Sequence, residues 1–209
     1  PSELVGFLSS SNQWTRLTAQ RLLVTRNERS VLPELQRLAS GPDPLGRLHA
    51  LWALEGLDAL PESILLKALS DPHPDIRASV LPLGSERFPT SASVHQAVIQ
   101  RVSDDAPAVR FAALQTLGGF SNRPPLQPIL DALWRDREEP WIRRAALATL
   151  ALGEERPALA ILMSQSATRS AQEGGGLDVV RELAALAGAR TSPSDGPQLV
   201  EPLILALQA

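Results

Sequence analysis

The chain has 209 residues, of which 44% are hydrophobic and 4% aromatic, and this length is sufficient for one extended domain with a continuous core. Its 20 basic and 23 acidic residues give a net charge of −3 without a block of like charge, so we expect no nucleic-acid partner, which would require a basic face. The absence of cysteine excludes disulfides, thiolate metal ligands, thiol nucleophiles and covalent haem attachment within these residues. No apolar run reaches the roughly 18 residues that span a bilayer, so we expect no direct membrane insertion.

Two helices separated by a short turn are predicted at the amino terminus, and the same pair then recurs along the chain. The first helices are expected from their helical apolar spacing at residues 4–10, 31–40, 62–70, 93–103 and 125–136. The second helix of the first pair contains WTRLTAQRLL. Each later second helix is expected to begin at a proline, because the first helical turn tolerates a fixed φ and a missing N–H; these are Pro44, Pro74, Pro107 and Pro140.

An arginine occupies the same place in every second helix, at intervals of 31, 30, 33 and 33 residues: Arg16, Arg47, Arg77, Arg110 and Arg143. Small or aliphatic residues follow three and seven positions later in most pairs, as Ala50 and Leu54 follow Arg47, and would form an apolar stripe. A period of this length marks a repeat array, whose units stack on one another and share a core.

The turn between the helices has a recurring order of aspartate, proline and Ile/Val-Arg. Asp71 and Asp104 each lie six residues before an arginine, Arg77 and Arg110 respectively. This order resembles the HEAT repeat, in a short variety similar to the HEAT-like repeats of bilin lyases. The resemblance implies an all-α fold, a right-handed α-solenoid of helix-turn-helix repeats of about 30–33 residues each.

We predict a single HEAT-like α-solenoid over residues 1–209, with repeats at about 1–28, 29–58, 59–90, 91–122 and 123–154 and a less regular part at 155–209. In this last part we expect a helix in PALAILMSQ, a mobile loop at 166–176, a helix in LDVVRELAALAGAR that ends near Gly188, and a final helix at 197–209. The chain starts without Met and inside a repeat, so we expect it to be a fragment or a processed product of a longer protein.

The repeated arginines and turn aspartates allow two interpretations. A row of guanidinium groups could bind an acidic partner, or each arginine could bond turn carbonyls and the aspartate of an adjacent repeat. The regular period favours the structural role, because interfaces between repeats must recur in every unit whereas binding sites seldom do. We predict that Arg77 and Arg110 contact Asp71, Asp104 or neighbouring turn carbonyls. The structural set is Arg16, Arg47, Asp71, Arg77, Asp104, Arg110 and Arg143.

Positions one and five residues after the arginine are expected to face outward on the concave side. With His49 and Glu55 they form a candidate protein-binding patch, comprising Leu17, Arg21, Leu48, Trp52, Phe111 and Gln115. The alternative is that curvature of the array buries these side chains against one another. Trp14 and Trp141 are expected to pack on turns and cover the ends of the stack, and Trp134 is expected to lie in the core.

We identify no catalytic, cofactor-binding or metal-binding residues. His49, His73 and His95 occupy different repeat positions, so they form no evident ligand cluster, and His73 is expected to be solvated or to cap a helix. No nucleophile elbow, phosphate-binding loop or His-Glu-x-x-His motif is present. We therefore expect this segment to be no enzyme and to hold no cofactor.

A narrower resemblance is carried by RLHALWALEGL and VRFAALQTLG in this order, and it extends over about residues 12–190. These segments resemble the HEAT-repeat part of large bacterial membrane-bound-dehydrogenase-type or haem-binding proteins. In that family a β-propeller precedes the repeats and a cytochrome c domain follows them. The resemblance implies an extracytoplasmic, periplasmic location and a parent protein that is a redox enzyme.

Three functions remain open. The favoured one is a non-catalytic scaffold that links the propeller to the cytochrome domain and binds protein, because it requires no catalytic residue. The second is an independent peptide- or protein-binding module whose concave face is centred on Trp52 and Leu48. The third is a bilin-lyase-like or other HEAT-repeat enzyme, such as one of the base-excision kind, which would require a polar cluster in a concave cleft.

Overall fold

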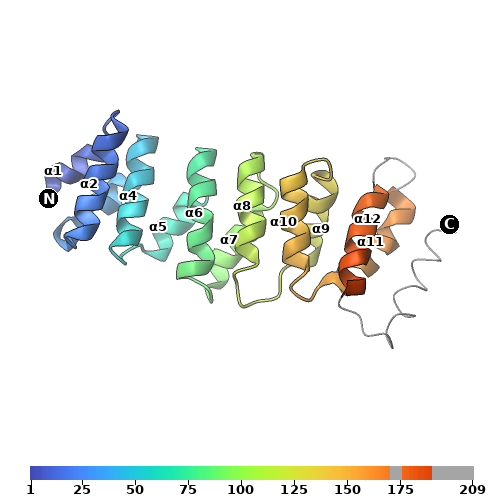
Figure 1. Ribbon diagram of the computed structural model, residues 1–209. Helices are drawn as coiled ribbons and strands as arrows, with labels where there is room; N and C mark the ends of the chain where they lie inside the picture. The colour runs from blue at the N-terminus through green and yellow to red at the C-terminus, as the bar shows by residue number, and fades with distance from the viewer. Residues whose placement is uncertain (170–175, 190–209) are drawn as a thin grey trace. The chain divides into compact units, whose positions relative to one another are not determined.

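The computed structural model describes residues 1–169 and 176–189, and all regular structure in these ranges is helical (Figure 1). The predicted all-α fold is therefore confirmed for the described part of the chain. By its internal contacts the chain divides into two compact units, Pro1–Ala97 (unit 1) and Val98–Ala209 (unit 2). The single domain and its repeat boundaries stay predictions, and the expected final helix at 197–209 lies outside the described residues.

Unit 1 contains three complete helix pairs and the start of a further helix. The pairs are α1 (Ser2–Phe7) with α2 (Gln13–Thr25), α3 (Leu32–Leu38) with α4 (Pro44–Gly56), and α5 (Glu62–Ala68) with α6 (Pro74–Arg87). A 3₁₀ turn at Arg29–Val31 leads into α3. The next helix, α7 (Ala92–Arg101), contains the boundary between the two units.

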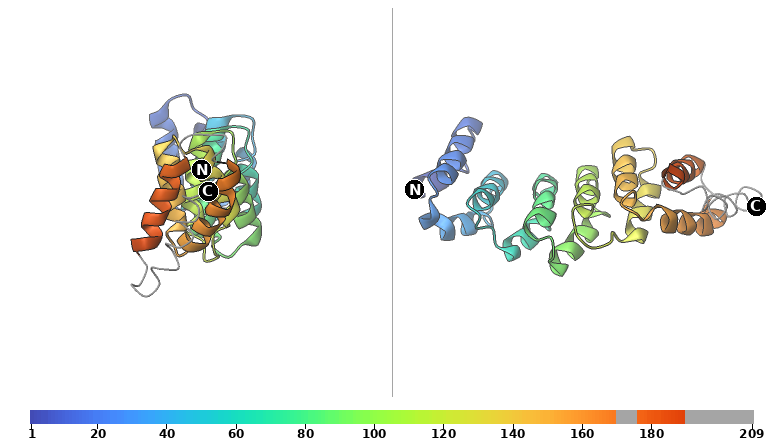
Figure 2. Two further views of the ribbon diagram at one scale, coloured as in Figure 1. Left: turned by 90° about the vertical axis from the view of Figure 1, so that its right-hand side faces the viewer. Right: turned by 60° about the horizontal axis from the view of Figure 1, so that its bottom comes forward.

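Unit 2 continues the alternation of first and second helices. Its elements are α8 (Pro107–Leu117), α9 (Leu126–Arg135), α10 (Pro140–Leu150), α11 (Glu155–Arg169) and α12 (Gly176–Ala189). Within each unit the first helices of the pairs form one layer and the second helices form another (Figure 2). The five predicted first helices are all present, and this two-layer stacking of helix pairs is the arrangement typical of an α-solenoid.

Proline and short polar side chains determine where the second helices begin. The predicted starts of α4, α6, α8 and α10 at their prolines are confirmed. Asp43 also caps α4, because its carboxylate accepts a hydrogen bond from the Gly46 N–H at 2.6 Å. The helix α2 has no such proline, and there Asn12 accepts a hydrogen bond from the Thr15 N–H at 3.2 Å.

The predicted apolar stripe forms the core between the two layers of each unit. Ala50 and Leu54 on α4 are fully buried, as are Ala113 and Leu117 on α8. Each fully buried leucine contributes roughly 1.5–3 kcal/mol of hydrophobic stabilisation. The small alanines leave the second helices of neighbouring pairs room to approach one another closely.

Arg47 and Asp71 join two neighbouring helix pairs of unit 1. The Arg47 guanidinium donates from Nη1 to the carbonyl oxygens of Gly41 and Pro42 in its own turn, at 3.1 and 3.0 Å. Its other edge forms a bidentate pair with the carboxylate of Asp71 in the following turn, at 2.7 and 2.8 Å. Asp71 in turn accepts from the His73 N–H at 2.8 Å, so one arginine fixes two successive turns.

The same arrangement recurs in unit 2 with Arg110 and Asp136. Arg110 Nη1 donates to the carbonyl oxygens of Asp104 and Asp105, both at 3.0 Å, and its Nε donates to Asp136 Oδ2 at 2.9 Å. We call this arrangement, which Arg47–Asp71 and Arg110–Asp136 exemplify, the arginine clip. Arg77 likewise donates to the carbonyl oxygens of Asp71 and Pro72, at 2.8 and 3.2 Å. The predicted bonds from Arg77 and Arg110 to turn carbonyls are therefore present.

Both charges of the unit 1 clip are buried. The side chains of Arg47 and Asp71 are only 11% and 8% exposed. Burial by itself would raise the pKa of Asp71, but hydrogen bonds from the Arg47 side chain and the His73 backbone lower it below its usual value. The same pairing raises the pKa of Arg47. Both shifts favour the ionised forms of the pair.

Arg16 uses a histidine in place of the aspartate. Its Nη1 donates to the carbonyl oxygens of Ser10 and Ser11, and its Nε donates to His49 Nε2 at 3.1 Å. Because a guanidinium can only donate, His49 Nε2 must accept, and the ring proton then resides on Nδ1, 2.7 Å from Gln20 Oε1. Burial lowers the pKa of His49, and the charge of Arg16 lowers it further. His49 is therefore buried in its neutral form.

The loop predicted at residues 166–176 is wrong for its first four residues. The helix α11 continues to Arg169, so residues 166–169 are not part of a loop, while residues 170–175 lie outside the described residues. The segment SQSATR contains neither glycine nor proline, and nothing in it breaks a helix. By contrast, α12 forms as predicted and ends at Ala189.

Trp14 and Trp141 do not pack on turns, because they are 73% and 69% exposed. Each lies two residues before a repeated arginine in the first turn of its helix. Since two residues correspond to about 200° around a helix, a residue at this position faces away from the side on which the arginine is held. Trp134 is half-buried, with the Arg137 guanidinium 5.8 Å from its ring centre.

In the described ranges no helix has the length and apolarity required to cross a membrane.

We predict that Arg47→Ala lowers the free energy of unfolding by about 3 kcal/mol, because it leaves a buried carboxylate without its partner. The matched control is Arg181→Ala, which removes an arginine from the exposed Arg181–Asp178 pair and is expected to cost about 0.5 kcal/mol or less. Urea unfolding followed by circular dichroism measures both. Equal losses for the two variants would contradict a structural role of the clip.

A second prediction concerns the pH dependence of stability in unit 1. Because the pKa of His49 is lower in the folded state, its contribution to stability is complete above its unfolded pKa of 6.5 and is lost as the pH falls below that value. We expect the decrease in melting temperature between about pH 7.5 and 5.5 to be smaller in His49→Gln than in the unchanged chain. His73→Gln, which alters an exposed histidine, should leave the decrease unchanged. An unaltered pH dependence in His49→Gln would contradict the assignment.

Candidate functional site

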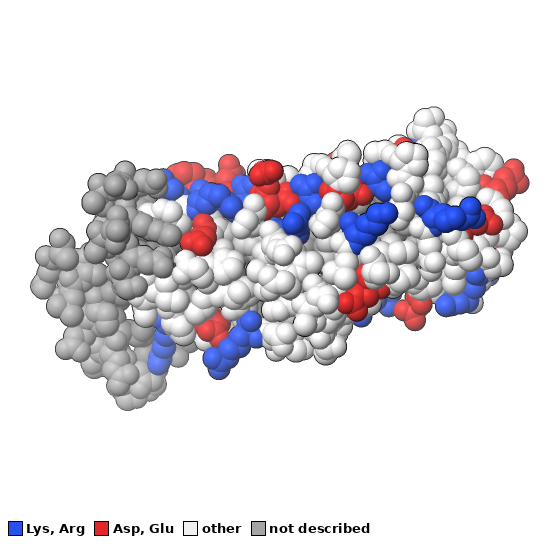
Figure 3. Space-filling model, turned by 180° about the vertical axis from the view of Figure 1, so that it is seen from behind, with Lys and Arg blue, Asp and Glu red and all other residues white. Residues whose placement is uncertain are grey.

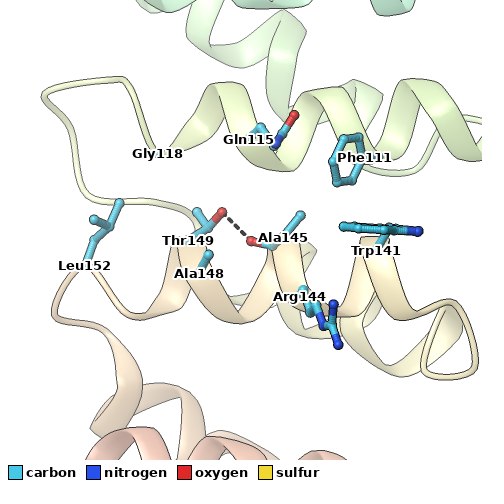
Figure 4. Close-up of a pocket in the computed structure, with 9 residues that line it drawn as sticks. All are labelled: Phe111, Gln115, Gly118, Trp141, Arg144, Ala145, Ala148, Thr149 and Leu152. Carbon is cyan, nitrogen blue, oxygen red and sulfur yellow. Dashed lines mark hydrogen bonds between the residues drawn. The ribbon is translucent and has the colours of Figure 1, made fainter.

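The helix α10 of unit 2 is bordered by two surface grooves. With α8 it lines a groove of about 500 Å³, the α8–α10 groove, whose residues are Phe111, Gln115, Gly118, Trp141, Arg144, Ala145, Ala148, Thr149 and Leu152 (Figure 4). With α12 it lines a groove of about 540 Å³, the α10–α12 groove, whose residues are Arg143, Arg144, Leu147, Ala148, Ala151, Glu182, Ala185 and Leu186. Arg144 and Ala148 line both grooves.

Large apolar side chains mark the two ends of the α8–α10 groove. At one end the rings of Phe111 and Trp141 point toward each other across the groove (Figure 4). At the other end Leu152 follows α10 and is 58% exposed. A Cβ atom at Gly118 would lie 3.4 Å from Leu152 Cδ1, in ordinary van der Waals contact, so Leu152 lies close to the end of α8. The groove therefore has an apolar binding position at each end.

The floor of the α8–α10 groove has little unused hydrogen-bonding capacity. The Thr149 hydroxyl lies 2.8 Å from the Leu114 carbonyl oxygen and 2.9 Å from that of Ala145, so it is satisfied within the wall (Figure 4). Ala145 and Ala148 add only methyl groups to the floor. A ligand in this groove would gain most from burying its own apolar surface.

Arg144 is the cation that the two grooves share. Its guanidinium carbon lies 5.7 Å from the centre of the Trp141 ring, in the range of a cation–π contact. Arg144 is exposed and forms no ion pair with a carboxylate of the described residues. Its neighbour Arg143 differs, because it donates to the Arg137 carbonyl at 2.8 Å and lies 3.4 Å from Glu182. Within the two grooves, Arg144 therefore has no opposite charge beside it.

The structure divides the predicted protein-binding patch between the two units. Phe111 and Gln115 belong to unit 2 and line the α8–α10 groove. The other members lie in unit 1, where Leu17 is 49% exposed, Arg21 is exposed, and Leu48 and Trp52 are half-buried. Their role in binding a partner stays a prediction.

Three members of the unit 1 set form contacts within the fold. The Trp52 indole N–H donates to Ser79 Oγ at 3.1 Å, which joins α4 to α6. Glu55 accepts hydrogen bonds from Arg87, which also pairs with Asp58. His49 is buried between Arg16 and Gln20, so the expectation that its side chain faces outward is wrong. The reason is that the position equivalent to Asp71 in the next turn is Gly41, so Arg16 bonds to the imidazole instead.

Of the residues that line the α8–α10 groove, sequence reasoning assigned only Phe111 and Gln115 to the binding patch, and it missed Trp141, Arg144, Ala148 and Leu152 among the others. Arg144 and Ala148 lie one and five residues after Arg143, the same positions that identified Phe111 and Gln115, so the repeat pattern was sufficient to find them. The predicted patch used these positions in the first, second and fourth pairs and left out the fifth. Leu152 lies beyond the end of α10, where the repeat pattern gives no signal.

Charged side chains of both signs are spread over the described part of the chain. In the view of Figure 3 acidic and basic side chains are interspersed, and the described residues on this face show no continuous basic patch. Residues 1–169 and 176–189 contain no group of three or more His, Cys, Asp or Glu side chains placed to hold a metal ion. His73 is exposed, with Nδ1 3.7 Å from Asp75 Oδ2.

Comparison with known families supports the helix-pair architecture. The family model for HEAT repeats matches residues 62–151 and 95–174, which together cover more than half of the chain. No curated protein matches the sequence. The match includes α8 and α10, so the α8–α10 groove lies between the second helices of HEAT repeats. The chain belongs to the HEAT-repeat family.

Proposed function

We propose that this chain is a non-catalytic scaffold that binds protein, and that the grooves beside α10 hold a segment of its partner. The observation that carries the proposal is the exposure of Trp141 and Leu152 at the two ends of the α8–α10 groove. HEAT repeats commonly use the outer positions of their helices for protein recognition, because stacking of the units creates extended surfaces.

The fold does not require these two side chains. Leu117 and Leu150 fill the core beneath α8 and α10, and Arg143 bonds to the turn before α10. Large apolar groups left on a surface at an energetic cost commonly mark an interface, and tryptophan is among the residues most enriched at the centre of interfaces. The apolar floor and the few polar groups of the groove are suited to binding rather than to proton or group transfer.

Unit 1 provides a second candidate surface on α2 and α4. Leu17 is half exposed there and Trp14 is the most exposed of the large apolar residues of the described chain. Trp52, the predicted centre of this surface, also joins α4 to α6 through Ser79. Replacing Trp52 would therefore disturb packing as well as any binding, and Trp141 is the cleaner probe of partner recognition.

The identity of the neighbouring domains is a narrower part of the proposal. The order of RLHALWALEGL and VRFAALQTLG supports a parent protein with a β-propeller before these repeats and a cytochrome c domain after them, outside the cytoplasm. In such a parent the chain holds no cofactor of its own, and the partner segment belongs to one of the two domains. An upstream propeller and a downstream Cys-x-x-Cys-His in the gene would support this version, whereas other neighbours would leave a free-standing binding module.

A bilin-lyase-like enzyme is the remaining alternative and would require a polar cluster in a cleft.

We predict that a photo-crosslinking amino acid at Gln115, in the wall of the α8–α10 groove, captures a discrete partner from an extract of the native cells. The same amino acid at Gln100, an exposed position on α7, should capture none. Adding Trp141→Ala to the Gln115 variant should reduce the adduct at least about tenfold, since loss of a buried interfacial tryptophan typically costs 2 kcal/mol or more.

Circular dichroism of each variant provides the control, because exposed Trp141 can be removed without loss of helicity. Adducts of equal yield from Gln115 and Gln100, or adducts at Gln115 that survive Trp141→Ala, would contradict the proposed groove.

A further inference from the structure

We propose that the segment bound by the grooves is an acidic peptide, in which one carboxylate side chain lies between large apolar residues and pairs with Arg144. This inference rests on the proposed function and adds the chemistry of the partner to it. It is carried by three observations: the charge balance of the grooves, the cation–π contact of Arg144 with Trp141, and the apolar positions on either side of that arginine.

The charge balance of the grooves favours an anionic ligand. Arg144 is the one charged residue among those that line the α8–α10 groove. In the α10–α12 groove Arg143 and Glu182 lie within ion-pair distance of each other, which leaves Arg144 as the uncompensated charge there too. A neutral ligand covering this surface would remove water from the Arg144 guanidinium without supplying hydrogen bonds in its place, which costs free energy. A carboxylate on the ligand accepts those hydrogen bonds and offsets the cost.

The contact with Trp141 places the guanidinium for such a pair. The Arg144 guanidinium carbon lies 5.7 Å from the Trp141 ring centre, and a cation–π contact uses none of the N–H donors in a hydrogen bond to an oxygen. These donors match the two oxygens of a carboxylate. The ring also restricts the motion of the long side chain, which reduces the entropy lost when the ion pair forms.

Apolar positions lie on both sides of Arg144. On one side are Phe111, Trp141 and Leu152 of the α8–α10 groove. On the other side are Leu147 and Leu186 of the α10–α12 groove. A segment that crosses α10 can therefore place an acidic residue at Arg144 and an apolar residue in each groove. A nucleic acid fits less well, because its successive phosphates need a row of cations, and of the two arginines that line these grooves Arg143 is already paired with Glu182.

The test is selection of binders from a random library of about twelve-residue peptides displayed on phage, against the whole purified chain. We expect enrichment of peptides with Asp or Glu between Leu, Ile, Phe or Trp. Selection against Arg144→Glu should enrich Lys or Arg at that place. Arg181→Glu, which reverses an exposed charge on α12 outside the residues that line the grooves, should select the same peptides as the unchanged chain.

Affinity measurements on an enriched peptide provide the second part of the test. Arg144→Ala should weaken binding about tenfold or more, as expected for loss of a charge-assisted hydrogen bond. Replacing the acidic residue of the peptide by Gln or Asn should cause a similar loss for the unchanged chain and no further loss for Arg144→Ala. Arg144→Lys keeps the charge but lacks the planar guanidinium, so its affinity for the peptide should lie between those of the unchanged chain and Arg144→Ala.

The outcomes separate the two proposals. Peptides that require Trp141 but show no acidic enrichment, or that bind Arg144→Glu as well as the unchanged chain, would overturn the inference and leave the proposed groove intact. Peptides whose binding is indifferent to Trp141→Ala would contradict the proposed function itself. Binding of a fluorescein-labelled single-stranded RNA that depends on Arg144 more strongly than peptide binding does would overturn the acidic-peptide inference.

Discussion

The fold depends on the way one guanidinium group satisfies two successive turns. In each clip the Nη1 group of the arginine donates hydrogen bonds to carbonyl oxygens of its own turn. The opposite edge of the guanidinium donates to the aspartate carboxylate of the next turn. Burying a charge is unfavourable unless it is paired and hydrogen-bonded, and Arg47 and Arg110 each donate to two turn carbonyls and to both oxygens of a carboxylate. Because the bonds are directional, the clip fixes the spacing of neighbouring helix pairs, which apolar packing alone would leave less defined.

The clip keeps its arginine and varies its acceptor. Asp71 and Asp136 are carboxylates, but Arg16 bonds to the imidazole of His49, and Arg143 lies beside Glu182 on α12. The arginine is retained because its bonds to the carbonyls of its own turn do not depend on the next pair. The acceptor can change wherever the next helix offers another oxygen or nitrogen at the right place.

Periodic features were predictable from the sequence, and features that depend on neighbouring side chains were not. Apolar spacing located the first helices, and the prolines located the starts of four second helices, because both signals are local. Asp136, which bonds to Arg110, was not predicted because it lies seven residues before the next repeated arginine, Arg143. Asp71 lies six residues before Arg77, which is the spacing that the pattern uses. The burial of His49 follows from what stands in the adjacent pair, where Arg16 donates to its ring, and one position in the sequence does not reveal this.

Each second helix has positions that stabilise the stack and positions that face outward, and this difference explains why the candidate site could be predicted only in part. The arginine and the residues three and seven positions later stabilise the stack, so their chemistry is constrained in every pair. The positions one and five residues after the arginine carry no such constraint, and they differ accordingly, as Leu48 and Trp52 on α4 differ from Arg144 and Ala148 on α10. Function in this chain is therefore expected where the repeat pattern is least regular, and α10 is such a place because a cation and an exposed tryptophan lie together there.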